Sequence, residues 1–284
     1  MTATVAANAE RPVLTAEELR RFCEFLYART GMQFGESKRY YIERRLFERL
    51  EATNAVSFAN YLLLLRSDAR EAATVINSFT VNETYFYREE HQLRCLGRSI
   101  LPEIVRSRGF GDKVRIWSQP CSTGEEAYSI ALWLLENWPM VDAYNVEIVG
   151  SDIDSEALES ARAGRYGQRS LSRLPAPVVE SYFEPATAGL RQLISDLRES
   201  VSFAEANLID PSSMNAQGRF DVIFCRNVLI YFDDDSRARA ADALFDCLTP
   251  GGFICLGHTE SMSRISDRFL MRRFVDAIVY QRPA

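Results

Sequence analysis

The sequence is poor in histidine and in closely spaced cysteines, which limits the metal chemistry available to it. Only two histidines occur among 284 residues, and none of the six cysteines forms a C-x-x-C pair. Zinc sites draw on closely spaced histidine and cysteine ligands, so we expect no metal site. Isolated cysteines in apolar runs are typical of small core residues in a reducing compartment.

The chain also lacks long apolar segments and an excess of basic charge. No apolar run approaches the roughly 20 residues of a membrane-spanning helix, so we expect no direct membrane insertion. Residues 1–12 show no basic and apolar regions of a signal peptide, and we expect a disordered tail there. A net charge of −6 argues against general nucleic-acid binding. We therefore expect a cytoplasmic protein, and its hydrophobic content of 47% can bury a sizeable core.

Residues 13–78 show helical periodicity and none of the alternation of an α/β domain. Thr15, followed by Glu17 and Glu18, is typical of a helix N-cap with acidic residues in the first turn. The pattern predicts an all-helical N-terminal domain over residues 13–78 and a linker over 79–94. Further helices are expected at 38–51, 57–65, 68–78 and near 91–105.

From Val114 the pattern alternates between strands and helices, which predicts an α/β domain over residues 95–284. Strands are expected at 114–118, 146–152, 201–205, 220–225, 252–257 and 274–281. Helices are expected at 125–137, 155–162 and 235–248. The stretch from about 165 to 202 is rich in proline and breaks this alternation, which indicates an inserted subdomain.

The most informative stretch is Val114–Tyr128, VRIWSQPCSTGEEAY. A strand, a turn of small residues and a helix N-terminus form the first unit of a Rossmann-type nucleotide site. The turn has no G-x-G-x-x-G pattern, and Glu125 and Glu126 would repel a phosphate at the helix N-terminus. A ligand with hydroxyls and positive charge fits better. S-adenosylmethionine has a ribose, an amine and a sulfonium but no phosphate, so the sequence predicts a methyltransferase.

Polar residues follow three other predicted strands. Asp152 can accept hydrogen bonds from a ribose, although a helix N-cap is the alternative and Asp154 also suits that role. Asn207 and Leu208 follow the third strand, where such folds hold adenine, but a loop asparagine is commonly a turn former. The apolar strand 220–225 ends in Arg226-Asn227 and continues to Tyr231. These are candidates for the crevice at the strand ends, with a salt bridge from Arg226 and a core tyrosine as alternatives.

A basic helix at residues 38–49 stands out in an otherwise acidic chain. It has two interpretations, a solvated face with i,i+4 ion pairs or a docking face for an acidic helical partner. Asp233-Asp234-Asp235, in contrast, is most simply the N-terminal cap of the helix that follows.

Several motifs together carry a family resemblance that spans residues 14–280. They are N-E-T-Y-F-Y-R, W-S-Q-P-C-S-T-G-E-E-A-Y-S-I-A, S-D-I-D, F-C-R-N-V-L-I-Y-F and G-G-F-I-C-L-G-H-T-E-S. On these motifs the chain resembles the CheR family of chemotaxis receptor methyltransferases. Members transfer methyl groups from S-adenosylmethionine to glutamates of cytoplasmic receptor signalling helices, which leaves S-adenosylhomocysteine. The resemblance implies a helical N-terminal domain, a Rossmann-like catalytic domain and a small antiparallel β subdomain inserted in it.

The resemblance also implies roles for individual residues. Arg88 and Tyr231 match the polar pair near the transferred methyl group, and Glu126 matches the cofactor-facing glutamate better than Glu125 does. The implied cofactor-binding residues are Asn82, Thr84, Arg88, Glu126, Asp152, Asn207, Leu208, Arg226 and Asn227. The implied docking face for receptor helices is Lys38, Arg39, Arg44, Arg45 and Arg49, and we expect a monomer.

The chain departs from part of the family in one segment. Between Tyr182-Phe183 and Asn207-Leu208 it is a few residues shorter than members whose β subdomain grips a receptor's C-terminal pentapeptide. We therefore expect methylation without that tether.

Two other functions compete with receptor methylation. A nucleic-acid or small-molecule methyltransferase could use the same cofactor fold, but the acidic charge and the absence of an N/D-P-P-Y/F motif argue against nucleic acid. A non-catalytic module that only binds a nucleotide or a partner is the second. The presence of Arg88, Glu126, Asp152, Asn227 and Tyr231 argues against it.

Overall fold

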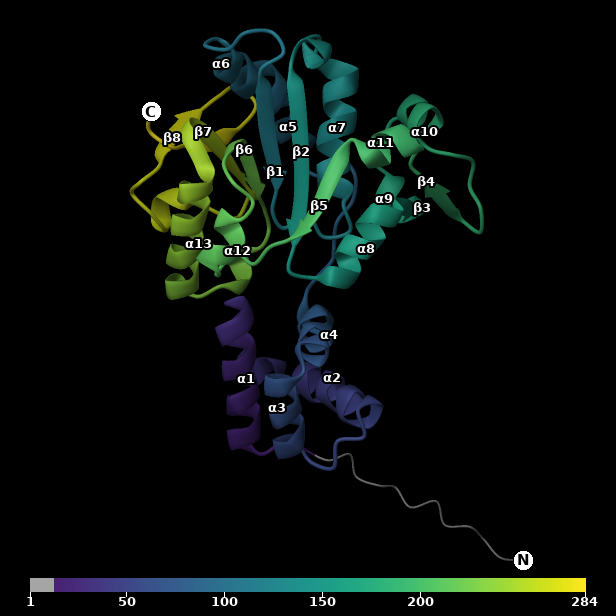
Figure 1. Cartoon of the computed structure of the whole chain (residues 1–284), viewed down its shortest axis with the longest axis vertical. Helices are drawn as coiled ribbons and strands as arrows, with labels where there is room; N and C mark the ends of the chain where they lie inside the picture. The colour runs from purple at the N-terminus through teal and green to yellow at the C-terminus, as the bar shows by residue number, and fades with distance from the viewer. Residues whose placement is uncertain (1–12) are drawn as a thin grey trace, which may run out of the picture. The chain divides into compact units, whose positions relative to one another are not determined.

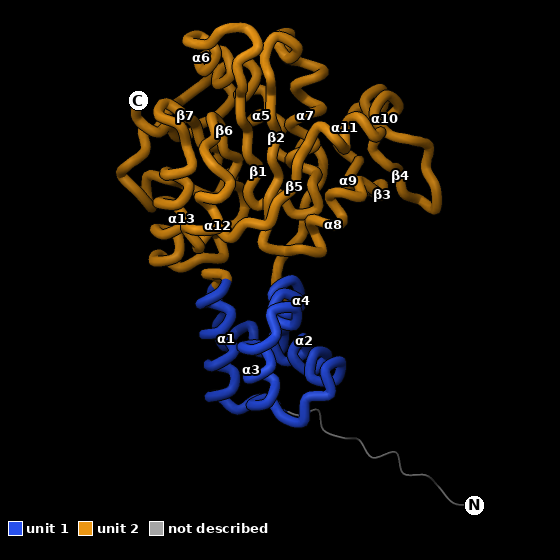
Figure 2. The backbone as a smooth tube through the Cα atoms, in the orientation of Figure 1, with its two compact units in different colours: residues 1–29, 33–78 blue, residues 30–32, 79–284 orange. Residues whose placement is uncertain are grey.

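The computed structural model describes residues 13–284, and the expected tail at residues 1–12 lies outside them. The chain divides into two compact units (Figure 2). The helical unit holds the described residues through Arg29 together with Gln33–Ser78. The sheet unit holds Thr30–Met32 and Phe79–Ala284. Within residues 13–284, no helix combines the length and apolar character that crossing a bilayer requires.

The helical unit is built from four α-helices whose apolar faces pack together. Thr15 begins the first helix with a capping box, because its hydroxyl accepts from the Glu18 N–H at 3.2 Å and the Glu18 carboxylate accepts from the Thr15 N–H at 2.8 Å. Phe22, Ile42, Tyr61 and Val75 are fully buried. The predicted helices are confirmed to within two residues at each boundary. They are α1 (Ala16–Thr30), α2 (Arg39–Ala52), α3 (Phe58–Ser67) and α4 (Ala69–Phe79), with a 3-10 turn η1 (Glu36–Lys38) before α2.

The sheet unit contains a seven-stranded sheet in the order β5-β2-β1-β6-β7-β9-β8 (Figure 1). The first five strands in this order are parallel, and the last two run antiparallel to their neighbours. β1 lies between β2 and β6, so the chain changes direction across the sheet at this point and opens a crevice at the strand ends. The strands are β1 (Lys113–Ser118), β2 (Asn145–Asp152), β5 (Val201–Glu205), β6 (Phe220–Cys225), β7 (Leu248–Leu256), β8 (Leu270–Arg273) and β9 (Ile278–Gln281).

Predicted strands β1, β2, β5 and β6 are confirmed, and β7 begins four residues earlier than expected. The predicted terminal strand at 274–281 is confirmed only over Ile278–Gln281, which is β9, and residues 274–277 form a turn instead. The chain forms an antiparallel hairpin there, because the Phe274 N–H donates to the Ala277 carbonyl at 2.9 Å and closes a turn. Asp276 in this turn pairs with Arg94 at 3.2 Å, a contact 182 residues away in sequence.

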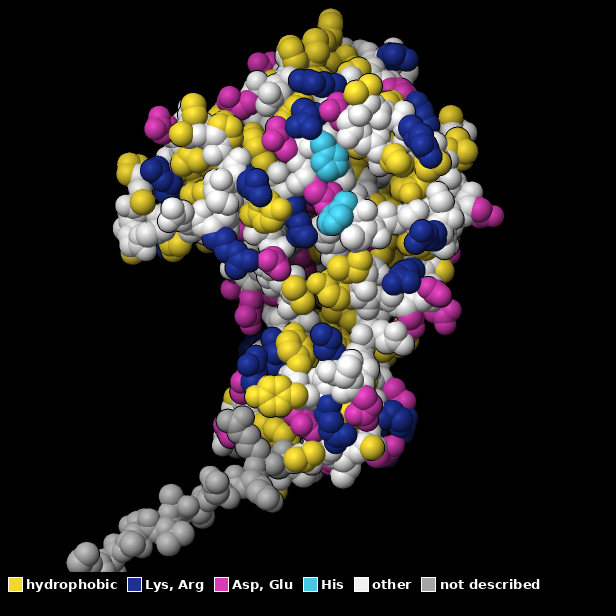
Figure 3. All heavy atoms as spheres, turned by 180° about the vertical axis from the view of Figure 1, so that it is seen from behind, with side chains coloured by type: hydrophobic (Ala, Val, Ile, Leu, Met, Phe, Trp, Pro, Cys, Tyr) yellow, Lys and Arg dark blue, Asp and Glu magenta, His cyan; other side chains and the backbone are white. Residues whose placement is uncertain are grey.

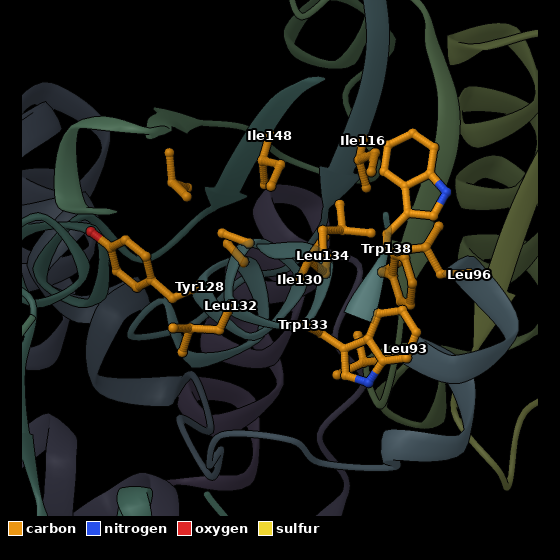
Figure 4. Packing of buried hydrophobic residues seen from close by; sticks show 14 of the residues in the cluster. Leu93, Leu96, Ile116, Tyr128, Ile130, Leu132, Trp133, Leu134, Trp138 and Ile148 are labelled. Carbon is orange, nitrogen blue, oxygen red and sulfur yellow. The ribbon is translucent and has the colours of Figure 1, made fainter. Parts of the chain in front are cut away.

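Two hydrophobic layers cover the two faces of the sheet. Successive strand residues alternate between them, with Ile116 in one layer and Trp117 in the other. Helix α7 (Glu125–Asn137) packs on the first face, where Ile130 and Leu134 lie towards Ile116 (Figure 4). Helix α13 (Asp234–Cys247) packs on the second face and is capped by Asp233, as predicted. The α/β class is therefore confirmed as a three-layer Rossmann-like arrangement.

Shorter helices complete this unit. The expected helix near 91–105 is confirmed as one helical run with a π-helical centre. The run consists of α5 (Glu90–Cys95), η2 (Leu96–Ile100) and α6 (Leu101–Val105). The others are η3 (Val141–Ala143), α8 (Ser155–Ala163), α12 (Pro211–Asn215), η4 (Leu229–Tyr231) and η5 (Met262–Arg264).

The insertion between α8 and β5 combines a small antiparallel sheet with short helices. Strands β3 (Arg165–Gly167) and β4 (Leu190–Gln192) pair antiparallel, in agreement with the predicted subdomain. Most of its regular structure is helical, however, in α9 (Gln168–Leu171), α10 (Ala176–Tyr182) and α11 (Ser195–Glu199).

Candidate active site

The turn from β1 into α7 is held against the neighbouring strand ends by Gln119. Its N–H donates to the Phe224 carbonyl of β6 at 2.8 Å, and its side-chain amide donates to the Ala206 carbonyl beyond β5 at 3.3 Å. Gly124 then enters α7 at a φ of 94°, where an added Cβ would lie 2.8 Å from the Ala161 side chain. Both the left-handed backbone and the close approach therefore require glycine at this position.

The two glutamates at the start of α7 have different partners. The Glu125 carboxylate accepts from the Thr123 hydroxyl at 2.6 Å and the Ser170 hydroxyl at 2.9 Å, and burial raises its pKa. This carboxylate complements the positive end of the α7 dipole, the place where a phosphate would otherwise bind. Glu126 accepts from the Ser118 hydroxyl at 2.8 Å and lines the adjacent pocket.

Asp152 is buried at the end of β2, one strand away from the β1–α7 turn. Its carboxylate accepts backbone N–H bonds from Ser122 at 2.8 Å and Asp154 at 3.0 Å. Burial raises the pKa of Asp152 to about 6, although these N–H donors oppose the shift. The alternative role of N-cap belongs to Asp154, which accepts from the N–H groups of Glu156 and Ala157. Asp152 is thereby left at the tip of its strand.

Asn82 of the linker joins this same corner. Its side chain accepts from the Ser122 hydroxyl at 2.8 Å and donates to the Asp154 carboxylate at 2.7 Å. The linker therefore lies beside the β1–α7 turn, even though the two are 40 residues apart in sequence.

Arg226 occupies the centre of a buried ionic network at the end of β6. Its side chain is only 2% exposed and pairs with Glu126 at 2.8 Å and with Glu89 at 3.3 Å. It also donates to the Arg88 backbone carbonyl at 2.8 Å, while its Nε has no hydrogen-bond partner among the described residues. The salt-bridge alternative for Arg226 is thus what the structure contains. The same contacts also bring it to the pocket lining.

The two carboxylates of this network respond differently to their surroundings. Burial raises the pKa of Glu126, with Arg226 acting in the opposite direction. Burial would also raise the pKa of Glu89, but Arg226 and His258 bring it below its ordinary value. His258 contacts Glu89 at 2.9 Å, and its side chain is 65% exposed. Figure 3 shows the two histidines of the chain on one face of the molecule.

Asn227 adopts a left-handed conformation, with φ at 60°, and is held by Glu260. The Glu260 carboxylate accepts backbone N–H bonds from Asn227, Val228, Leu229 and Gly257, at 2.8 to 3.0 Å. A Cβ at Gly257 would lie 2.7 Å from the Asn227 side chain, so only glycine fits there. The loop after β6 is therefore organised by an acid of the chain itself.

One pocket gathers the linker, the β1–α7 turn and the end of β6. Of the predicted cofactor residues it brings together Thr84, Arg88, Glu126, Arg226 and Asn227. The Arg88 guanidinium donates to the Glu83 carbonyl at 2.8 Å and lies 5.8 Å from the centre of the Tyr85 ring. The full lining is Val81, Glu83, Thr84, Tyr85, Arg88, Leu93, Pro120, Cys121, Ser122, Glu126, Ser129, Arg226 and Asn227.

The remaining predicted residues lie outside this lining. Asn207 follows β5, and its side chain accepts from the Ile209 N–H at 3.2 Å, as a turn former does. Leu208 beside it is buried. Tyr231 ends η4 and is 37% exposed. Asn82 and Asp152 also lie outside this lining. The roles of all the predicted site residues, inside the lining or outside it, stay predictions.

Strained backbone clusters around the pocket. Six described non-glycine residues have positive φ, and four of them, Tyr87, Glu89, Ser122 and Asn227, belong to the linker, the turn or the loop after β6. Such conformations cost about 1–3 kcal/mol each and persist where the surroundings hold them, most often at functional sites.

Sequence reasoning assigned no role to Glu89, Gln119, Ser122 or Glu260. All four lie within the quoted motifs or directly beside them, so the motifs marked the region, but their contacts depend on distant partners. Among residues 13–284, no group of three or more His, Cys, Asp or Glu side chains is arranged to hold a metal.

The donor set fits S-adenosylmethionine better than a phosphate-bearing nucleotide. Asp152 at the strand tip can accept from ribose hydroxyls, and Glu126 faces the pocket with a carboxylate that can balance positive charge. Glu125 fills the helix N-terminus where a phosphate would bind. The Ser122 and Ser129 side chains are the hydroxyl-bearing serines of the lining.

Comparisons with known proteins identify the family over most of the chain. Residues 17–80 match the all-alpha domain of CheR methyltransferases, and residues 82–276 match their SAM binding domain. Chemotaxis protein methyltransferase 2 of Vibrio cholerae is 46% identical over 95% of this chain and 94% of its own length. Chemotaxis protein methyltransferase 2 of Pseudomonas aeruginosa is 36% identical over 89% of each chain. The chemotaxis protein methyltransferase of Escherichia coli is 34% identical over 95% of this chain and 93% of its own length. The chain therefore belongs to the CheR methyltransferase family and is an enzyme that takes its methyl group from S-adenosylmethionine.

Proposed function

We propose that this enzyme methylates glutamate side chains on the cytoplasmic helices of chemotaxis receptors and forms glutamyl methyl esters. The observation that carries the proposal is the placement of Arg88 at the cofactor pocket, beside Glu126 and Arg226. A guanidinium binds a carboxylate through two parallel hydrogen bonds, so it suits an acidic acceptor. Arg226 is already shared between two acids of the chain, whereas Arg88 contacts only a backbone carbonyl and a ring face in the described contacts.

The pocket lining suits a reaction that moves no proton. No histidine belongs to it, and burial raises the pKa of the lining Cys121 thiol well above its usual range, so that thiol stays protonated. A glutamate carboxylate is ionised at neutral pH and needs no general base. When bound, the cofactor supplies a methyl group on a positively charged sulfur. That sulfur is the leaving group, and it keeps the electron pair of the broken bond.

The residues of the chain then act by positioning and by excluding water. Arg88 orients the acceptor carboxylate, and we assign Tyr231 to its second oxygen or to the methyl path. Asn82, Thr84, Asp152, Asn207, Leu208 and Asn227 hold the cofactor, with Glu126 facing it and Arg226 supporting Glu126. Correct orientation of two reactants can contribute roughly 7–11 kcal/mol in favourable cases.

A methyl-transfer assay tests this function directly. The chain is incubated with radiolabelled S-adenosylmethionine and separately with receptor cytoplasmic fragments, RNA and a metabolite extract. We expect alkali-labile label, released as methanol, on the receptor fragments alone. A receptor fragment with its acceptor glutamates changed to alanine is the control. Alkali-stable label or labelled RNA would contradict the proposal, as would cofactor binding without transfer.

Receptor docking on the helical unit is a separate part of the proposal, and it uses the basic face Lys38, Arg39, Arg44, Arg45 and Arg49. Arg49 pairs with the buried Glu71 at 2.5 Å, Arg39 pairs with Glu43 at 3.0 Å, and Arg45 lies 3.6 Å from the centre of the Tyr41 ring. These three side chains therefore also have partners within the unit. Lys38 and Arg44 are exposed, and Arg44 reaches Glu48 at 4.0 Å. Of the five residues, we propose that Lys38 and Arg44 make the main contacts with the receptor.

We also propose that receptor binding needs no C-terminal pentapeptide. In support, β3 and β4 have three residues each, which gives a short sheet for gripping a peptide. Titration of the chain with a receptor-tail pentapeptide should show no saturable binding. Micromolar affinity would overturn this part of the proposal.

We further propose that the enzyme works as a cytoplasmic monomer without nucleic acid. Sedimentation of the purified chain with and without receptor fragment measures its oligomeric state. A dimer at micromolar concentration would contradict the monomer.

A further inference from the structure

The linker glutamate Glu89 is partly buried beside the pocket but does not line it. Its side chain is 12% exposed, and its backbone is left-handed with φ at 55°. Its carboxylate accepts from the Gln92 amide at 2.8 Å and contacts Arg226 at 3.3 Å and His258 at 2.9 Å. Gln92 also donates to the Leu256 carbonyl at the end of β7, at 2.7 Å. Three partners thus hold the Glu89 side chain in one place.

The net charge around Glu126 depends on Glu89. Arg226, Glu89 and Arg88 are charged side chains close enough to act on Glu126, and Arg226 contacts both acids directly. Two guanidiniums and two carboxylates balance to zero. Without Glu89 the same group would carry one positive charge, directly beside the pocket that must accept a cationic sulfonium.

We propose that Glu89 is a positioning and specificity residue of this active site. Through Arg226 it fixes Glu126 at the pocket, and its charge favours the sulfonium of S-adenosylmethionine over the neutral thioether of the product. The inference rests on the proposed methyl transfer at this pocket and adds a distinct role to it. Arg226 transmits the effect, because its guanidinium contacts both acids and the Arg88 backbone carbonyl.

The two ligands differ at their sulfur by one positive charge and one methyl group. An extra positive charge near the pocket therefore weakens binding of S-adenosylmethionine and leaves binding of S-adenosylhomocysteine nearly unchanged. Loss of packing or of pocket shape would weaken both ligands together. The ratio of the two affinities thus separates an electrostatic role from a purely structural one.

Calorimetric titration of the full chain with each ligand, without receptor, tests the inference. The variants are Glu89→Gln, which removes the charge, and Glu89→Asp, which keeps it on a shorter side chain. Glu90→Gln is the matched control, because Glu90 is half exposed, pairs with Arg94 and lies outside the pocket. We expect Glu89→Gln to shift the affinity ratio towards S-adenosylhomocysteine by on the order of tenfold, a typical effect of one charge at short range. Glu89→Asp should restore most of the ratio, and Glu90→Gln should leave it unchanged.

Several outcomes would overturn the inference. A ratio in Glu89→Gln equal to that of the native chain would do so, as would a ratio equally changed in Glu89→Asp. If Glu89→Gln does not fold, Glu89→Ser removes the charge with room for water, and the same criterion applies. A native chain that binds neither ligand would overturn the proposed function itself. A native chain that binds and transfers methyl groups, with a Glu89→Gln variant that behaves like the control, would overturn the role of Glu89 alone.

Discussion

Two arginines in different units of the molecule use carboxylates in contrasting ways. In the helical unit, Arg49 forms two hydrogen bonds with Glu71, at 2.9 and 2.5 Å, and the Tyr61 hydroxyl donates to the same carboxylate at 2.6 Å. In the sheet unit, Arg226 lies between Glu126 and Glu89, and its buried Nε has no hydrogen-bond partner within residues 13–284. The first cluster is a matched ion pair that, with Tyr61, joins three helices. In the second, one guanidinium is shared by two acids, and it borders a pocket.

Removal of Arg226 should have the largest effect on the free energy of unfolding and on methyl transfer. Arg226→Met leaves Glu126 and Glu89 buried without their cation, and such a change costs about 3–5 kcal/mol of the free energy of unfolding. Urea denaturation of the variant and the native chain measures the loss, and we expect methyl transfer to disappear with it. A loss below about 1 kcal/mol would show that water replaces the guanidinium at little cost.

Substitution of Arg88 tests whether turnover requires a guanidinium that has no ion pair in the described contacts. Arg88→Ala should lower turnover by roughly a hundredfold or more, because the acceptor carboxylate loses its orientation. The thermal midpoint should stay unchanged, and Arg88→Lys, which keeps the charge without the planar fork, should recover only part of the rate. Near-normal turnover in Arg88→Ala would reject the orienting role.

The matched pair of the helical unit should affect stability alone. Arg49→Met leaves Glu71 without its cation, but the Arg49 side chain is 26% exposed, so we expect a loss of about 1–3 kcal/mol. Calorimetric affinity for S-adenosylmethionine should equal that of the native chain. A weaker affinity would remove the distinction between the two clusters.

Asp152 has no cationic partner in the described contacts. Its contribution to cofactor affinity should therefore depend on pH. Its pKa is raised to about 6, so protonation between pH 7 and 5 removes the ionised acceptor and should weaken cofactor binding. Asp152→Asn should lower affinity roughly tenfold, a typical effect for a lost charged hydrogen bond, and should flatten the pH profile. Affinity that rises as the pH falls would contradict this role.

The raised pKa of Asp152 also affects the free energy of unfolding. Its pH dependence has the opposite sign to that of a carboxylate whose pKa is lowered by folding. Folding favours the protonated form of Asp152, because its pKa in the folded chain lies above its ordinary value of 3.8. Its contribution to the free energy of unfolding is therefore full below pH 3.8 and is lost as the pH rises through about 6. Comparison of urea midpoints for the native chain and Asp152→Asn across this range measures it.

The smallest effect should come from an exposed arginine. Arg44→Glu should raise the apparent Michaelis constant for the receptor about threefold to tenfold, since a rim charge acts mainly on encounter. Added salt should reduce the difference, and cofactor affinity should not change. Arg66→Glu, the same charge change at an exposed position of α3, is the control. Equal effects of both variants would indicate a general charge effect.

Local sequence patterns predict much of the fold and part of the site. Strands β1, β2, β5 and β6 could be predicted because each shows an apolar run that ends at a turn or polar residue. The β1–α7 turn and Asp152 could be placed because both follow directly from such strands. The terminal hairpin could not, because its turn is held by Arg94, 182 residues earlier in the chain.

The network around Arg226 lay beyond sequence reasoning for the same reason. Arg226 and Glu126 are 100 residues apart, and no local pattern links them. The sequence therefore left cofactor contact and salt bridge as open alternatives for Arg226. The fold brings Glu126 and Glu89 to Arg226. Its side chain therefore forms salt bridges with both acids and also borders the pocket.

The carboxylate of Glu260 has a consequence for competition inside a cell. Consecutive backbone N–H groups in a left-handed turn form a concave site that attracts anions such as phosphate. The Glu260 carboxylate already accepts from three consecutive N–H groups, those of Asn227, Val228 and Leu229, and also from that of Gly257. A free anion would have to displace this carboxylate, so the loop offers phosphate-bearing nucleotides no ready site that would compete with the nucleoside.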